Sequence, residues 1–192
     1  MDKQKVLNSI IIFLCVVLVS FILIGVLNSK KDYIKVTDHI YIEEGLNRES
    51  ADTIQQYIDI LPQCIKQYFI DEGDWKVCVV NSLPNMIKGQ TVIEEKCVYI
   101  VSGYEYDLLL HEFAHIYLHK NPFDGDFEEI YKQEAKAMIE AYYGMDSEYH
   151  YSNSTEFYCT AWNIVYMMQG NDQFGVAPKT FDYFSTLFNE LY

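Results

Sequence analysis

The chain of 192 residues opens with a long apolar stretch, since residues 6–29 carry no charged side chain. A helix over residues 6–27 would be about 33 Å long at 1.5 Å per residue, which is enough to cross a hydrocarbon core of roughly 30 Å. The apolar run is longer than that of a cleaved signal peptide, and no A-x-A-like cleavage site follows it. We therefore predict that residues 1–29 form an uncleaved anchor that contacts the lipid bilayer through residues 6–27.

Beyond this stretch, apolar positions recur at the spacings of helices and short strands. Residues 30–49 are predicted to be a short lead-in. From Ser50 to Phe69 the spacing is helical, although Pro62 kinks or splits the helix. Strands are predicted over residues 75–80, 88–93 and 97–101. Further helices are predicted over residues 107–120, 127–143, 154–169 and 178–191. We interpret Ser154 as the N-cap of the helix that it begins.

This order of elements, a helix, then strands, then helices, predicts an α+β domain over residues 50–192. A hydrophobic fraction of 50% excludes a disordered chain. The net charge is −14, and 27 of the 28 acidic residues lie at or beyond Asp32. Such an acidic domain repels phosphate backbones, so nucleic-acid binding is excluded.

The lysines around the apolar stretch do not fix its orientation, because they flank both of its ends. A short N-terminus followed by a C-terminal domain usually leaves that domain outside. We therefore expect a single-pass protein of the cell membrane with an extracytoplasmic domain. The domain's cysteines, Cys64, Cys78, Cys97 and Cys159, are scattered and fit either two disulfides or four buried thiols.

The strongest chemical signal is the sequence HEFAH within the predicted helix over residues 107–120. His111 and His115 are one helical turn apart, so both imidazoles can bind one metal ion. Glu112 then lies beside the ion, where it can take a proton from a water activated by zinc. The motif predicts one catalytic Zn²⁺ ion and hydrolysis of peptide bonds. His119, one turn further on, is interpreted as a residue outside the ligand set.

A catalytic zinc ion needs a third protein ligand, and two glutamates are candidates. Glu156 stands near the start of a capped apolar helix, where a carboxylate needs a partner such as a metal ion. Glu134 lies among charged residues, as on a solvated helix face. The residues alone favour Glu156 and leave Glu134 open.

Several segments together resemble one known family. These are the HEFAH motif, the segment SNSTEFYCTAW at residues 152–162 and the segment PKTFDYF at residues 178–184. They are similar to the anthrax lethal factor-like metallopeptidases, which include the Pro-Pro endopeptidases, and the similarity begins at about Leu61. The resemblance implies a zincin-like fold with Glu156 as the third zinc ligand. It also implies that Tyr149 stabilises the oxyanion, a role for which nearby Tyr151 is the alternative.

The sequence departs from this family at two places. Ala114 stands where a glycine is usual, and Cys159 and Thr160 stand where an acidic residue is common. Neither change removes a ligand. We therefore predict a membrane-anchored zinc endopeptidase that cleaves a peptide or protein substrate.

Two alternatives remain open. The segments LLLHEFAHIYLH and QEAKAM resemble the ImmA/IrrE-like regulatory metalloproteases, in which Glu134 would be the third ligand. The other alternative is a catalytically inactive zincin fold that serves as a binding or immunity protein.

Overall fold

The computed structural model describes residues 31–61, 66, 69, 74–144 and 148–191. The chain divides into two compact units, Met1–Asp32 and Tyr33–Tyr192, of which the second is described here. The anchor predicted over residues 1–29 lies outside the described residues. Within the described part of the chain, no helix has both the length and the apolar character that crossing a membrane requires.

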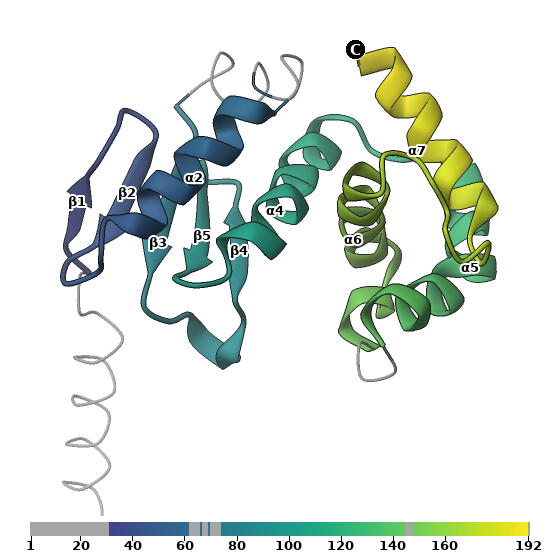
Figure 1. The fold of residues 1–192 in the computed structure, drawn as a ribbon, viewed down its shortest axis with the longest axis horizontal. Coiled ribbons are helices and arrows are strands. Elements are labelled where there is room, and N and C mark those ends of the chain that lie inside the picture. Colours follow the sequence, from purple (N-terminus) through teal and green to yellow (C-terminus); the bar gives the residue numbers. More distant parts are fainter. Residues whose placement is uncertain (1–30, 62–65, 67–68, 70–73, 145–147, 192) are drawn as a thin grey trace, which may run out of the picture. The chain divides into compact units, whose positions relative to one another are not determined.

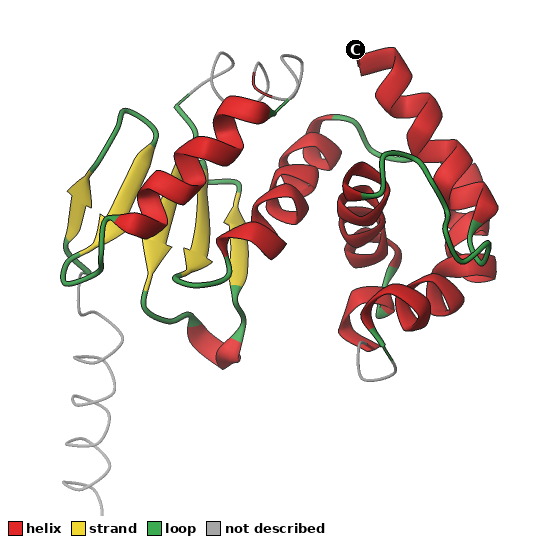
Figure 2. Cartoon of the chain, in the orientation of Figure 1, coloured by secondary structure: helices red, strands yellow, loops and turns green. Residues whose placement is uncertain are grey.

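The N-terminal half of the second unit is built on a five-stranded mixed sheet (Figures 1 and 2). Its strands are β1 (Tyr33–Lys35), β2 (Ile40–Glu43), β3 (Lys76–Val80), β4 (Gly89–Val92) and β5 (Cys97–Val101). The order across the sheet is β1-β2-β3-β5-β4. The three central strands β2, β3 and β5 are parallel, and the edge strands β1 and β4 are antiparallel to their neighbours. Residues predicted as a lead-in therefore contribute two strands of the sheet.

One face of the sheet carries the apolar core. The register places Ile40 beside Val77 and Val77 beside Val98, and the next layer repeats this pattern two residues later. Helices α2 (Glu49–Ile60) and α4 (Glu105–Lys120) lie over this face (Figure 1). Because side chains alternate along a strand, this register directs every second residue of β2, β3 and β5 into the core.

The opposite face of the sheet carries two of the cysteines. Cys78 on β3 and Cys97 on β5 are buried, and their sulfur atoms are 2.9 Å apart. Cys159 is buried in a helix, and all three are free thiols. Cys64 lies outside the described residues.

The C-terminal half is helical and consists of α5 (Gly125–Tyr143), α6 (Ser154–Met167) and α7 (Pro178–Leu191), with the short 3-10 turn η3 (Glu148–Tyr151) before α6. Phe127 of α5 is fully buried at the centre of an aromatic cluster. Its ring lies 5.8 Å from that of Phe157 on α6 and 5.8 Å from that of Phe184 on α7. These contacts join the three helices, and the α+β prediction is confirmed.

The start of α6 differs in detail from the prediction. The N-cap is Asn153, whose side-chain oxygen accepts a hydrogen bond from the backbone N–H of Glu156 at 2.9 Å. Ser154, which was predicted to be the cap, instead donates to Glu128 on α5 at 2.6 Å. The hydroxyl of Ser154 therefore links α6 to α5, while the side chain of Asn153 caps the N-terminus of α6.

Candidate metal centre

Helix α4 lies between the sheet and α6, and it carries the two motif histidines on the side that faces α6. His111 is buried and His115 is half-buried. Their Nε2 atoms are 3.2 Å apart, and their rings meet edge-on with centroids 5.0 Å apart. This is the geometry expected of two residues at positions i and i+4 of one helix.

Glu156, in the first turn of α6, completes the group. Its Oε2 atom lies 3.4 Å from Nε2 of His111, and its Oε1 atom lies 3.8 Å from Nε2 of His115. One ligand atom from each of the three residues lies within 4.8 Å of the others, which is close enough to hold one metal ion. The structure thus brings together the three residues expected to bind the metal.

The three groups fit a cation because they confront one another with lone pairs. Burial, and then the charge of His111, lowers the pKa of His115 to about 4, so its ring is neutral at neutral pH. Burial alone would raise the pKa of Glu156, but the two nearby histidines bring it below its usual value. The buried Oε2 atom of Glu156 also lacks a hydrogen-bond partner. A divalent cation would satisfy all three groups at once.

Glu112 lies on the neighbouring side of α4, against the edge strand β4. The hydroxyl of Thr91 lies 2.7 Å from Oε2 of Glu112, to which it donates, and 3.1 Å from the backbone oxygen of the same residue. Burial raises the pKa of Glu112, which makes it a better proton acceptor than an exposed glutamate. A Cβ atom at Gly89 would collide with this carboxylate, so a larger residue there would displace the side chain of Glu112.

Tyr149 and Tyr151, the two candidates for stabilising the oxyanion, have different surroundings in the structure. Tyr149 is 59% exposed and lines the hollows beside Glu112. Partial burial of the phenol and the nearby charge of Glu156 raise its pKa to about 12, so the phenol keeps its proton at neutral pH. Tyr151 packs against the core, and its backbone oxygen accepts a hydrogen bond from Tyr131 at 3.0 Å.

Two adjoining hollows flank Glu112. One has a volume of about 330 Å³ and is lined by His111 and Glu112 of the motif and by Tyr104, Tyr143 and His150. The other has a volume of about 490 Å³ and extends along β4 toward the exposed His119. Together they can hold several side chains of an extended ligand on either side of the metal group.

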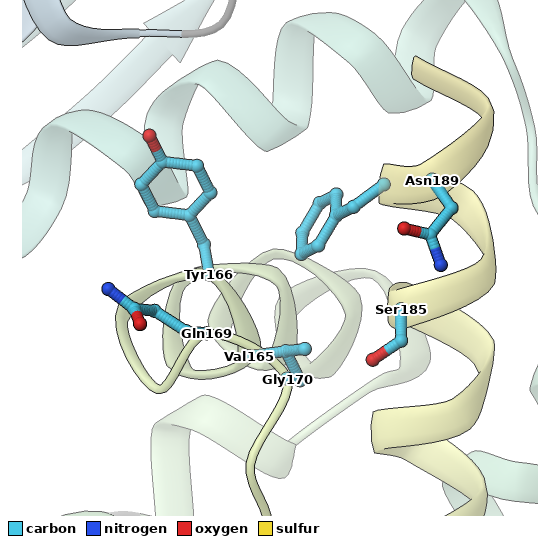
Figure 3. A pocket seen from close by; sticks show the side chains of 7 residues that line it. Val165, Tyr166, Gln169, Gly170, Ser185 and Asn189 are labelled. Carbon is cyan, nitrogen blue, oxygen red and sulfur yellow. The ribbon is translucent and has the colours of Figure 1, made fainter. Parts of the chain in front are cut away.

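A third hollow, of about 500 Å³, lies between the end of α6 and α7 (Figure 3). It is lined by Val165, Tyr166, Gln169, Gly170, Ser185, Phe188 and Asn189. This set contains no histidine, cysteine or carboxylate, and it shares no residue with the hollows beside Glu112. It is therefore separate from the metal group.

Glu134, the alternative ligand, has a structural role. It is buried in α5, contrary to the expectation of a solvated face, and its carboxylate reaches the start of α7. Its carboxylate accepts hydrogen bonds from the backbone N–H groups of Lys179 at 3.1 Å and Thr180 at 2.8 Å. These are orphan donors of a helix N-terminus, where a negative charge is favourable.

Sequence reasoning missed two polar residues behind the metal group. The hydroxyl of Thr160 lies 3.3 Å from Nδ1 of His111 and 3.1 Å from Nδ1 of His150. Thr160 drew attention only as a departure from the family pattern, and His150 carried no signal, because its place in η3 depends on the packing of that turn against α6.

No family model and no curated protein sequence matches the chain. Its fold nevertheless resembles that of a solved endopeptidase. Among solved structures, the chain is similar to the Pro-Pro endopeptidase PPEP-2 from Paenibacillus alvei, with a TM-score of 0.56 and 19% sequence identity. The match covers 79% of this chain and 97% of the PPEP-2 chain. At this identity the likeness shows the fold alone.

The metal group predicts opposite effects for the two candidate glutamates. Glu156→Ala should abolish stoichiometric binding of a divalent metal ion while the domain stays folded, because it removes one of the three groups that could hold the ion. Glu134→Ala should keep the metal but lower the free energy of unfolding by about 2 kcal/mol, because two N–H groups lose a charged acceptor. Metal analysis after dialysis and urea unfolding measure the two effects. Loss of metal in Glu134→Ala alone would refute this assignment.

Proposed function

We propose that the protein is a zinc-dependent endopeptidase in which His111, His115 and Glu156 hold the metal ion. One observation carries the proposal. The ligand atoms of the three residues lie within 4.8 Å of one another, and the buried carboxylate of Glu112 lies beside them. Two histidines and one glutamate, with room for one more ligand, are the donor set of catalytic zinc. The fold is shared with PPEP-2, which is an endopeptidase.

A bound zinc ion supplies electrostatic activation of a water and of the peptide carbonyl. Glu112 accepts the proton of the attacking water and passes it to the leaving amine. The hydrogen bond from Thr91 holds its carboxylate in place for this role. Glu112 contributes no ligand atom to the metal group, so it is available for proton transfer.

Tyr149 completes the proposed machinery. Its phenol keeps its proton and lies near Glu156, so it can donate to the charge that develops on the scissile carbonyl oxygen. A hollow lined by His115, Tyr149 and Glu156 lies beside the metal group and gives an extended chain access to it.

The proposed substrate is a peptide or an exposed protein segment. Strand β4 is an edge strand of the sheet and lies beside α4. Its outer edge can therefore pair with an extended peptide. Such pairing would carry the peptide past Glu112 and into the two hollows that flank it.

Glu112→Gln should retain zinc at one ion per chain and lose about 100- to 10,000-fold in peptide cleavage, because the amide cannot accept the proton. A peptide library digested by the wild-type protein provides the substrate for this comparison. The matched control is Glu105→Gln, which changes another buried glutamate of α4 that lies outside the metal group. Equal loss in both variants, or full activity in Glu112→Gln, would contradict the proposed role.

Tyr149→Phe should lower kcat by about 100-fold while one zinc ion per chain stays bound, because it removes a donor to the charge that develops on the substrate and no metal ligand. Tyr151→Phe makes the same chemical change two residues away and should leave kcat within a factor of two. If Tyr151→Phe proves the more damaging substitution, the oxyanion donor has been misassigned.

We also infer that residues 6–27 anchor the domain to the outer side of the cell membrane, since this stretch is free of charge and long enough to cross a bilayer. The full-length protein should sediment with membranes after an alkaline carbonate wash. Protease added to intact cells should remove the domain. Release by the wash, or protection until the cells are lysed, would contradict the anchor or its orientation, respectively.

A further inference from the structure

Thr160 is a buried polar residue directly behind the metal group. It is 1% exposed and lies four residues after Glu156 on α6, so both side chains project from the same face of the helix. Its hydroxyl is 3.3 Å from Nδ1 of His111, the ring nitrogen that does not face the other ligands. Thr160 therefore contacts a proposed ligand on the side away from the metal.

When His111 binds a metal ion, these hydrogen bonds have a single possible direction. His111 offers the lone pair of Nε2 to the ion, so its proton lies on Nδ1, and Thr160 must accept it. The single hydroxyl proton of Thr160 is then free to be donated to Nδ1 of His150, 3.1 Å away. This leaves the proton of a neutral His150 on Nε2.

His150 is itself held in place, which makes it a firm end point for this chain. Its ring stacks on Tyr143, with centroids 4.9 Å apart and planes 25° apart. The phenol oxygen of Tyr143 in turn accepts a hydrogen bond from Asn163 of α6 at 3.3 Å. The position of the acceptor for Thr160 is thus fixed by packing as well as by hydrogen bonding.

We propose that Thr160 is a positioning residue for the metal centre: its hydroxyl holds His111 in the Nδ1–H tautomer and in the ring orientation that directs Nε2 to the metal, with His150 as the acceptor that orients the hydroxyl. This inference rests on the proposed metal site. Groups that bind the outer nitrogen of a ligand histidine commonly change metal affinity by 10- to 100-fold.

A purely local role for the hydroxyl is the competing explanation. A threonine within a helix can donate to the backbone oxygen four residues earlier, which affects stability but not a distant imidazole. Replacement by valine removes the hydroxyl at nearly constant size, whereas replacement by serine retains it. The two explanations therefore differ in what serine restores and in whether zinc affinity changes.

The experiment measures the zinc dissociation constant by competition with a chelating dye for the wild type, Thr160→Val, Thr160→Ser and Thr180→Val. Thr180→Val is the matched control, since it removes the hydroxyl of another buried threonine, one that donates to Glu134 instead. We expect a 10- to 100-fold weaker affinity for Thr160→Val, and values within threefold of the wild type for the other two. Wild-type affinity in Thr160→Val, or equal weakening in Thr160→Ser, overturns the proposal.

A second measurement needs no variant. Long-range ¹H–¹⁵N spectra of the imidazole groups in the zinc-loaded wild type should show the Nδ1–H tautomer for His111 and the Nε2–H tautomer for His150. A proton on Nδ1 of a neutral His150 overturns the proposed chain. If the wild type binds no zinc, the proposed function fails and this inference fails with it. If zinc binds but the tautomers or the Thr160→Val affinity disagree, only the role of Thr160 fails.

Discussion

The packing of α6 against α4 is the contact on which the rest of the structure depends. The ring of Trp162 on α6 lies 5.0 Å from that of Tyr117 on α4, and this contact sets the helices at the distance where Glu156 reaches His111 and His115. Each helix is fixed from its outer side as well. The sheet packs against α4, and α5 and α7 pack against α6 through aromatic contacts. Truncating one of these buried rings would lower the free energy of unfolding by several kcal/mol.

The sequence predicts helices and strands well where the apolar spacing within one segment is enough to identify the element. Three short strands and the later helices were recognised from apolar spacing, and the residues of HEFAH fall on one helix as expected. Strands β1 and β2 were missed because they have three and four residues, and only their pairing with neighbours distinguishes them from a loop. Ser154 was a plausible cap by residue type, but its hydroxyl reaches a partner on another helix.

The residues of the candidate site were predictable where residue type and local spacing alone indicate the chemistry. A histidine pair at helical spacing does so, and Glu156 was favoured by its apolar surroundings. Glu134 and Thr160 do not, because burial and hydrogen-bond partners that come from other helices determine what they do. Glu134 is buried and paired where α7 docks on α5, and its partner Thr180 lies 46 residues later in the chain, so nothing near Glu134 in the sequence reveals this role.

The three proposed ligands come from two helices that are separated in the sequence by the whole of α5. A nascent chain that has reached only the end of α4 contains the complete HEFAH motif, yet it cannot assemble the centre, because Glu156 has not been synthesised. Competence then arises late, when α6 docks on α4. The proposed peptidase activity is therefore absent while the chain is being synthesised, because its metal centre is not yet complete.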